Sequence, residues 1–272
     1  MKTKNIIPCL ILLLMTPLSS GFAEKTMNSN IKEENVTYSV GGKVYKGYVA
    51  YNENLKGKRP AILVVHEWWG LTGYPKMRAR KLAELGYIAM AVDLFGDGKI
   101  ATNPTEAQAY TAPFYGNPQL ATSILNAALI KMKGYKQTDP STVYAIGYCF
   151  GGAIVLNYAK LGGDIKAAVS FHGGLKGVTP DKNLLKAKIL VCNGGSDKFV
   201  SEADIATFKH QMDSIGAIYT FKSYPGALHA FSNPAATELG KKFNMAIAYN
   251  KDADLNSWND MKMFFSSLAI KK

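Results

Sequence analysis

Short apolar runs alternate with longer segments of helical periodicity along most of the chain. From residue 61 onward this alternation predicts parallel strands joined by crossover helices. The predicted strands cover residues 34–40, 43–51, 61–65, 87–92, 142–146, 166–170, 188–192 and 217–223, and the predicted helices cover residues 75–85, 118–133, 150–161, 202–215, 234–250 and 256–270.

Local signals refine these boundaries. The pair Gly41-Gly42 separates the first two strands and predicts an antiparallel hairpin. Ser201 with Asp204 three residues later predicts a helix N-cap with an acidic first turn. Apolar residues recur at helical spacing in the last predicted helix: Trp258, Met261, Phe265 and Leu268. This spacing indicates core packing rather than a cofactor site.

The chain contains no internal repeat and no low-complexity linker, so we expect residues 24–272 to form a single domain. The predicted class is α/β, with a mainly parallel twisted sheet, an N-terminal antiparallel hairpin and helices on both faces. Residues 104–118 leave two alternatives open, an aromatic lid or a helix packed on the core.

Residues 1–23 have the pattern of a secretory signal peptide. Lys2 and Lys4 precede an apolar stretch at 6–15, and small or helix-breaking residues lead to Ala23. We expect cleavage after Ala23 and a periplasmic or secreted protein, an uncleaved anchor being the alternative. The apolar stretch is too short to span a bilayer comfortably, so no stable membrane insertion is expected.

The composition fits a folded domain, because 47% of the residues are hydrophobic and 19% are charged. The formal net charge of +12 raises the alternative of a nucleic-acid or membrane partner. The positive residues are scattered, however, and Arg59, Arg78 and Arg80 are the only arginines. Bidentate phosphate recognition depends on arginine, so we expect no nucleic-acid partner and interpret the lysines as solubilising.

Two cysteines, Cys149 and Cys192, lie beyond the predicted signal peptide. Exported proteins often pair their cysteines, so a disulfide is one interpretation. We favour free thiols, because both cysteines stand at carboxyl ends of predicted strands. The chain has no C-x-x-C motif, which argues against a thiol–disulfide oxidoreductase.

Residues 147–151 read Gly-Tyr-Cys-Phe-Gly and lie between a predicted strand and a predicted helix. This is the nucleophile-elbow pattern with Cys149 in the place of serine. The flanking glycines suit a sharp turn, which exposes the thiol at a helix N-terminus where the amide dipoles favour a thiolate. A glycine-rich turn without catalytic function is the alternative.

An acid and a histidine follow Cys149 in the chain order that this elbow requires. Asp197 comes directly after the strand at 188–192, and His229 follows the final strand. The carboxylate can orient the imidazole, and the imidazole can act as base toward the thiol. A turn aspartate and a structural histidine are the alternatives. Together the three residues predict a catalytic triad.

The loop after the strand at 61–65 supplies candidates for an oxyanion hole. The backbone amides of Trp68 and Phe150 are the predicted donors. Glu67 is placed to hydrogen-bond the thiol or to take its proton, and a water-exposed loop residue is the alternative. The two tryptophans, Trp68 and Trp69, are equally compatible with core packing.

Together these motifs resemble the dienelactone hydrolase (carboxymethylenebutenolidase) family over roughly residues 45–270. The motifs are H-E-W-W-G, V-D-L-F-G at 92–96, G-Y-C-F-G-G, F-H-G at 171–173, G-G-S-D at 194–197 and the late L-H-A-F. The resemblance implies an α/β-hydrolase fold, no cofactor or metal, and a triad of Cys149, Asp197 and His229. It also implies that Glu67 helps to deprotonate the thiol when substrate arrives.

Two features depart from that family. Members that hydrolyse dienelactone hold its carboxylate with two arginines, but here the corresponding regions, 95–99 and 230–233, contain none. Lys99 can offer a point charge there, although not a bidentate clamp. The second departure is the signal peptide, because the degradative members act in the cytoplasm.

We therefore expect an exported hydrolase that cleaves a small ester or lactone through a thiol acyl-enzyme. Candidate pocket-lining residues are His172, Tyr110, Phe114 and Lys99. The alternative is a non-catalytic ligand-binding protein on the same fold. Nothing in the sequence specifies a peptide groove or an oligomeric state.

Overall fold

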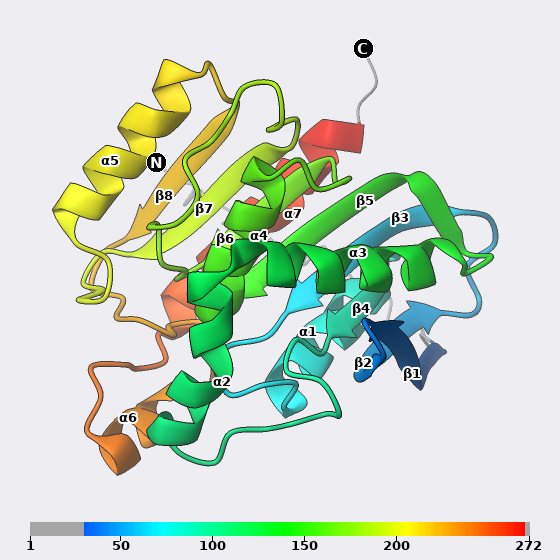
Figure 1. Cartoon of the computed structure of the whole chain (residues 1–272), viewed down its shortest axis with the longest axis horizontal. Coiled ribbons are helices and arrows are strands. Elements are labelled where there is room, and N and C mark those ends of the chain that lie inside the picture. Colours follow the sequence, from blue (N-terminus) through cyan, green and yellow to red (C-terminus); the bar gives the residue numbers. More distant parts are fainter. Residues whose placement is uncertain (1–29, 270–272) are drawn as a thin grey trace, which may run out of the picture.

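The computed structural model describes residues 30–269, in which eight strands form one sheet covered by helices (Figure 1). The strands are β1 (Ile31–Val40), β2 (Lys43–Asn52), β3 (Arg59–Val65), β4 (Ile88–Val92), β5 (Thr138–Tyr148), β6 (Ala167–Phe171), β7 (Lys188–Gly194) and β8 (Tyr219–Tyr224). The helices are α1 (Gly73–Glu84), α2 (Pro104–Gly116), α3 (Pro118–Lys133), α4 (Phe150–Lys160), α5 (Glu202–Ser214), α6 (Ala236–Phe243) and α7 (Lys251–Ala269).

The strand order in the sheet is β1-β2-β4-β3-β5-β6-β7-β8. The β1–β2 and β2–β4 pairs are antiparallel, and every pair from β4–β3 to β7–β8 is parallel. Gly41 and Gly42 turn the β1–β2 hairpin with φ of 56° and 79°, a region that glycine adopts without strain. The predicted α/β class, mainly parallel sheet and N-terminal hairpin are confirmed.

The central strands are buried on both faces, which explains why they read as continuous apolar runs. In β3, Ile62 and Val64 belong to the core under α1 and α7, whereas Leu63 and Val65 belong to the core under α3, α4 and α5. All four side chains are fully buried. Since successive side chains on a strand point to opposite faces, one apolar run fills both cores.

Two local predictions about the helices are confirmed. Ser201 and Asp204 form a reciprocal capping box at the start of α5, each side chain accepting a hydrogen bond from the other residue's backbone. In α7, Met261 and Phe265 are buried in the core, and Trp258 packs against it half-buried. The C-terminal helix therefore completes one face of the sheet.

The helix predicted over 234–250 is wrong in its second half. Helix α6 ends at Phe243, and Asn244 follows in the left-handed region with φ of 50°. Ile247 then forms a β-bridge with His229. The amides of Ala248 and Asn250 donate to carbonyls of the loop at 229–231, and helical spacing of apolar residues does not reveal such pairing.

The segment at 104–118 is largely helix α2. Asn103 caps it by accepting a hydrogen bond from the Glu106 amide at 3.0 Å, and Pro104 occupies the first helical position. Phe114 on α2 is buried, whereas the neighbouring Tyr115 is 66% exposed. The segment thus combines helix–core packing with an exposed aromatic residue.

The signal-peptide prediction for residues 1–23 lies outside the described residues. Among the helices from α1 to α7, none combines the length and the apolar character that crossing a bilayer requires.

Candidate active site

Cys149 occupies a strained turn between β5 and α4. Its backbone has φ of 53° and ψ of −117°, a conformation that non-glycine residues rarely adopt. A Cβ atom on Gly147 would collide with the Gly151 carbonyl, and a Cβ on Gly151 would collide with the Val65 carbonyl. Both flanking glycines are therefore required sterically, and the turn leaves the cysteine half-buried rather than enclosed.

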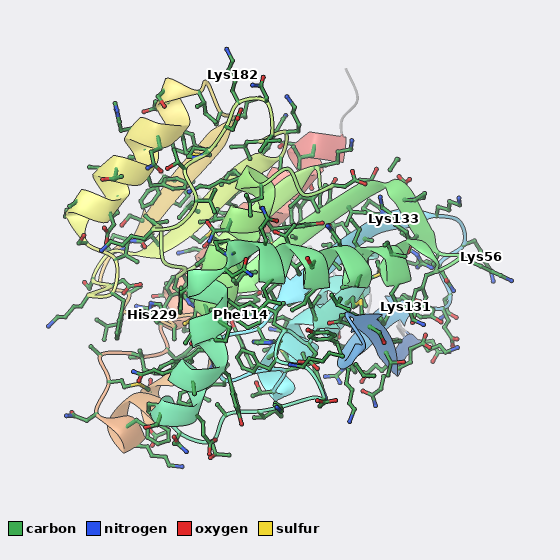
Figure 2. All side chains as sticks on the ribbon, viewed as in Figure 1. Lys56, Phe114, Lys131, Lys133, Lys182 and His229 are labelled. Carbon is green, nitrogen blue, oxygen red and sulfur yellow. The ribbon has the colours of Figure 1, made fainter. Side chains whose placement is uncertain are left out.

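His229 and Asp197 meet at the carboxyl edge of the sheet, His229 lying on the loop after β8 (Figure 2). The Nδ1 atom of His229 lies 2.8 Å from Oδ2 of Asp197, and both side chains are buried. The other carboxylate oxygen accepts a hydrogen bond from the Phe199 amide at 2.8 Å. With Nδ1 engaged, Nε2 is the ring nitrogen left for another partner.

The loops that carry Asp197 and His229 are tied to their neighbours through the backbone. The Ser196 amide donates to the Ala227 carbonyl at 2.9 Å, which joins the two loops. On the other side, the Ala248 amide donates to the His229 carbonyl at 3.3 Å. The segment after α6 therefore supports the histidine loop directly.

The electrostatic surroundings favour a protonated His229. Burial lowers the pKa of the imidazole, but the charge of Cys149 and hydrogen bonds to Asp197 and Cys149 outweigh burial and raise the pKa to about 10. A shift in this direction indicates that Cys149 and Asp197 both interact with the ring and favour its protonated form. The structure thus brings Cys149, His229 and Asp197 into one interacting group.

Glu67 is buried, so the alternative of a water-exposed loop residue is wrong. Its Oε2 accepts a hydrogen bond from Nδ2 of Asn233 at 2.6 Å. Burial raises the pKa of the Glu67 carboxyl to about 7, opposed by Asn233 and by the charges of His229 and Arg78. The sequence analysis did not identify Asn233, whose only signal was its position four residues after His229.

The buried His66 ring links the loop that bears Trp68 to the loop after β4. This buried ring lies with Nδ1 2.6 Å from the Glu67 carbonyl, and its Nε2 accepts from the Leu94 amide at 3.2 Å. Within residues 30–269, neither the Trp68 amide nor the Phe150 amide has a hydrogen-bond acceptor in the protein. Trp69 is buried, whereas Trp68 is half-buried.

His172, predicted to line the pocket, has a fully buried side chain. Its Nδ1 accepts a hydrogen bond from the Cys149 amide at 3.0 Å. Burial and the neighbouring charges of His229 and Arg78 place the pKa of His172 well below its usual value. A neutral His172 therefore holds the backbone of Cys149 through this hydrogen bond.

A buried polar chain continues from His172 toward α7. Nε2 of His172 lies 2.7 Å from the Ser232 hydroxyl, which lies 2.7 Å from the Tyr74 hydroxyl. Arg78 donates to the Tyr74 hydroxyl at 3.3 Å and to the Ser232 carbonyl at 2.6 Å, and it forms an ion pair with Asp254. None of these contacts between distant segments was predicted from the sequence.

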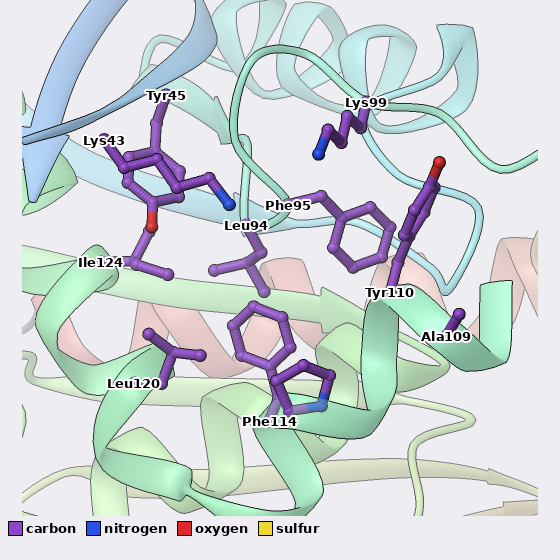
Figure 3. A pocket seen from close by; sticks show the side chains of 11 residues that line it. Lys43, Tyr45, Leu94, Phe95, Lys99, Ala109, Tyr110, Phe114, Leu120 and Ile124 are labelled. Carbon is purple, nitrogen blue, oxygen red and sulfur yellow. The ribbon is translucent and has the colours of Figure 1, made fainter. Parts of the chain in front are cut away.

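The remaining predicted pocket residues, Tyr110, Phe114 and Lys99, line a cavity of about 250 Å³ (Figure 3). Neither Cys149 nor His229 lines this cavity. The structure thus brings these three predicted residues together around one hollow.

Two exposed aromatic side chains lie beside this region, Phe199 against His229 and Tyr115 against Phe150. Phe199 is 58% exposed, and its ring centroid lies 4.9 Å from that of His229. The Tyr115 ring on α2 lies 5.9 Å from the Phe150 ring, centroid to centroid; burial and then the charge of Cys149 raise the pKa of Tyr115. Exposed aromatic residues beside a reactive group form an apolar rim.

Cys149 and Cys192 are both free thiols, as favoured from the sequence. Among residues 30–269 no three His, Cys, Asp or Glu side chains are grouped so that they could hold a metal ion.

Comparisons with known proteins place this arrangement in context. The sequence profile of the dienelactone hydrolase family matches residues 45–269. Protein usf from Aquifex pyrophilus is 27% identical over 236 residues, covering 85% of this chain and 96% of its own. A Methylorubrum extorquens protein with the provisional name carboxymethylenebutenolidase is 33% identical over 187 residues, 64% of each chain.

Solved structures agree with these sequence comparisons. A dienelactone hydrolase-like promiscuous phosphotriesterase from metagenomic libraries superimposes with a TM-score of 0.82 and 30% identity, covering 88% of this chain and 98% of its own. A protein named m3DLH gives a TM-score of 0.83 and 30% identity, covering 87% and 98%.

Proposed function

The chain belongs to the dienelactone hydrolase family of α/β-hydrolases, and we propose that it cleaves small esters or lactones through a Cys149 acyl-enzyme. The observation that carries the proposal is the buried His229, bonded to Asp197 at 2.8 Å and raised in pKa to about 10 with Cys149 as a cause. A thiolate–imidazolium pair is ready to attack a carbonyl carbon.

In the proposed reaction, the Cys149 thiolate attacks the carbonyl carbon and the electron pair moves to the carbonyl oxygen. The amides of Phe150 and Trp68 receive this oxyanion, a role supported by their lack of other acceptors among the described residues. The tetrahedral intermediate then collapses. His229 gives its proton to the departing alkoxide, leaving a thioester on Cys149 and a neutral imidazole.

Water completes the cycle. The neutral His229 takes a proton from a water molecule, whose oxygen attacks the thioester carbonyl. Collapse of the second intermediate releases the carboxylic acid and restores the thiolate–imidazolium pair. Asp197 holds the tautomer throughout, because its carboxylate lies on the Nδ1 side of the ring.

Glu67 is proposed to modulate the thiol. Its pKa of about 7 and the coupling to His229 put its ionisation in the same pH range in which the enzyme would work. The bond from Asn233 fixes one carboxyl oxygen at 2.6 Å. Because amides cannot titrate, Asn233 leaves the charge of this pair to be decided by Glu67 alone.

The proposed substrate is neutral near the reacting bond. Phe199 and Tyr115 offer apolar surface beside the triad. The chain's three arginines are engaged elsewhere: Arg59 with backbone carbonyls, Arg78 with Asp254 and Arg80 with Glu33. A substrate carboxylate at the triad would therefore lack a guanidinium partner, which favours simple esters over dienelactone.

The test compares the two cysteines as matched variants. We expect Cys149→Ala to lose hydrolysis of p-nitrophenyl acetate and butyrate while keeping its circular dichroism spectrum, and Cys192→Ala to retain most activity. Intact-protein mass spectrometry after rapid acid quench is expected to detect the acylated wild-type chain. Near-full activity of Cys149→Ala would contradict the thiol mechanism, and inactivity of the wild type toward all esters and lactones tested would favour the ligand-binding alternative.

Export through residues 1–23 is proposed from their charge and apolar pattern alone. Expression of the full chain in a Gram-negative host, followed by osmotic shock and N-terminal sequencing, tests it. We expect the released protein to begin at Glu24. Recovery of the chain only from the cytoplasm with residues 1–23 intact would contradict export.

A further inference from the structure

The cavity lined by Tyr110, Phe114 and Lys99 has the features of a second ligand site. It opens between β2, the loop after β4 and the helices α2 and α3, and its volume is about 250 Å³. Figure 3 shows Phe95 and Phe114 facing the hollow together with aliphatic side chains from α3. An engineered apolar cavity of about 150 Å³ is enough for benzene, so this one can accommodate a single ring or a short alkyl chain.

Two ammonium groups stand over this apolar floor. Figure 3 shows the side chains of Lys43 and Lys99 reaching into the hollow from different walls, with their amines on the side of Leu94 and Phe95. In the described part of the chain, neither lysine forms an ion pair. The Lys43 amine lies 5.6 Å from the Tyr45 ring centroid, a cation–π contact that leaves its hydrogen-bond donors free.

Among the described residues, the carboxylate of Asp93 forms no ion pair with either lysine, and backbone amides occupy its oxygens. Buried Asp93 accepts hydrogen bonds from the amides of Phe95, Gly96 and Gly98 at 2.9 to 3.0 Å. It also accepts from the Lys46 amide of β2 at 2.9 Å. Asp93 therefore ties two walls of the cavity together and presets their spacing.

The cavity is separate from the triad, although it is close to it. The Phe150 ring lies 5.5 Å from Phe114 and 6.1 Å from Phe95, centroid to centroid, and so forms the partition between the two sites. Neither Cys149 nor His229 reaches the cavity. Occupation of this site does not depend on the hydrolytic chemistry.

We propose that this cavity binds a small amphipathic carboxylate, with its anionic group between Lys43 and Lys99 and its apolar part against Phe95 and Phe114. The paired ammonium groups select for an anion, and the aromatic floor selects for an alkyl chain or a single ring. A binding site of this chemistry goes beyond the proposed ester hydrolysis, because its ligand has no bond to cleave.

The first experiment compares three probes that share a chain length and differ in charge: octanoate, octan-1-ol and octylammonium. The protein carries carboxamidomethylated Cys149, so that the triad is blocked. By ligand-observed NMR titration at low salt, we expect octanoate to bind about tenfold more tightly than octan-1-ol, and octylammonium to bind more weakly than both. Added salt is expected to reduce the preference for octanoate.

The second experiment removes the two charges. The double variant Lys43→Gln/Lys99→Gln is expected to bind octanoate about tenfold more weakly, with octan-1-ol affinity unchanged. The matched control is Lys56→Gln/Lys182→Gln, which removes two exposed lysines at the periphery of the molecule (Figure 2) and alters net charge equally. We expect this control to bind octanoate like the parent protein.

Three outcomes would overturn the proposal: equal affinities for octanoate and octan-1-ol, equal losses in the two double variants, or disappearance of octanoate binding on alkylation of Cys149. The last result would assign octanoate to the triad instead. An inactive but octanoate-binding protein would refute the proposed hydrolysis and leave this inference standing.

Discussion

Cys149 and Cys192 stand at the same edge of the sheet, at the carboxyl ends of the parallel strands β5 and β7, yet their surroundings are opposite. Cys192 is still within its strand, paired in register with Phe171 and Lys222. Its sulfur is fully buried and accepts a hydrogen bond from the Tyr224 hydroxyl at 3.4 Å. Burial raises the pKa of this thiol to about 12.

Cys149 lies one residue beyond its strand, and that single step changes its chemistry. A residue in a sheet directs its side chain onto a face, here the face covered by α7. The turn at Cys149 leaves the ladder instead and presents the thiol to His229 at the start of α4. The comparison teaches that backbone conformation, rather than position at a strand end, distinguishes a cysteine presented to a histidine from one enclosed in the core.

The largest expected effect is a loss of activity on changing Asp197, the residue proposed to orient His229. Asp197→Asn preserves shape but removes the charge that accepts from His229 Nδ1. We expect kcat/KM for p-nitrophenyl butyrate to fall about 10³- to 10⁴-fold, because the imidazole adopts the wrong tautomer. Unchanged thermal unfolding of the variant serves as the control, and a loss below tenfold would contradict the triad.

Alkylation compares the two thiols directly. At pH 7 we expect iodoacetamide to modify Cys149 at least about a thousandfold faster than Cys192, since the thiolate is the reacting form and Cys192 is both buried and raised in pKa. Peptide mapping by mass spectrometry measures each rate. Addition of guanidinium chloride should equalise them. Comparable alkylation rates in the native protein would contradict the predicted difference in reactivity between Cys149 and Cys192.

Glu67 tests whether burial raises the pKa of a carboxyl group in the active-site region as it raises the pKa of the Cys192 thiol. Its folded pKa of about 7 exceeds the ordinary carboxyl value of 4.5, so the folded state binds a proton more tightly than the unfolded state. The resulting stabilisation is complete below pH 4.5 and is lost as pH rises to about 7 and beyond. Relative to Glu67→Gln, the free energy of unfolding of the wild type should fall by up to about 3 kcal/mol across that interval.

Urea titrations of the two proteins at several pH values provide this measurement. Gln at position 67 keeps an oxygen that can accept from Asn233, so the variant changes charge rather than contacts. Parallel stability curves between pH 4.5 and 8 would contradict the raised pKa of Glu67.

The smallest expected effect comes from the glycine that lets α4 approach β3. Gly151→Ala places a methyl group against the Val65 carbonyl, and we expect a loss of about 1 to 3 kcal/mol in the free energy of unfolding. Gly174→Ala is the matched control, because a Cβ there meets no atom within 4 Å. Equal stability of the two variants would show that the elbow tolerates displacement.

Most of the sheet was predictable because it depends on local signals. The apolar runs, glycine turns and helix caps each depend on a few neighbouring residues. The order of Cys149, Asp197 and His229 can also be read directly along the chain. The contacts between Glu67 and Asn233 and between Cys149 and His172 join residues distant in sequence. Such pairings depend on how loops meet after folding, so no short stretch of sequence predicts them.

The same limit explains the error after Phe243. Residues 245–250 contain apolar side chains at a spacing compatible with a helix, but Ile247 pairs with His229 and the Asn250 amide donates to Phe231. The partner residues lie eighteen and nineteen residues upstream, in a loop that shows no strand pattern of its own. A helix was therefore the simpler local prediction.

The backbone contacts at 247–250 make the His229 loop depend on residues that follow α6. A truncation or frameshift after α6 spares Cys149, Asp197 and His229, yet it deletes the segment that braces the base and the helix whose Asp254 anchors Arg78. A product that ends after α6 therefore keeps the Cys149 thiol but lacks the residues whose amides bond to the His229 and Phe231 carbonyls.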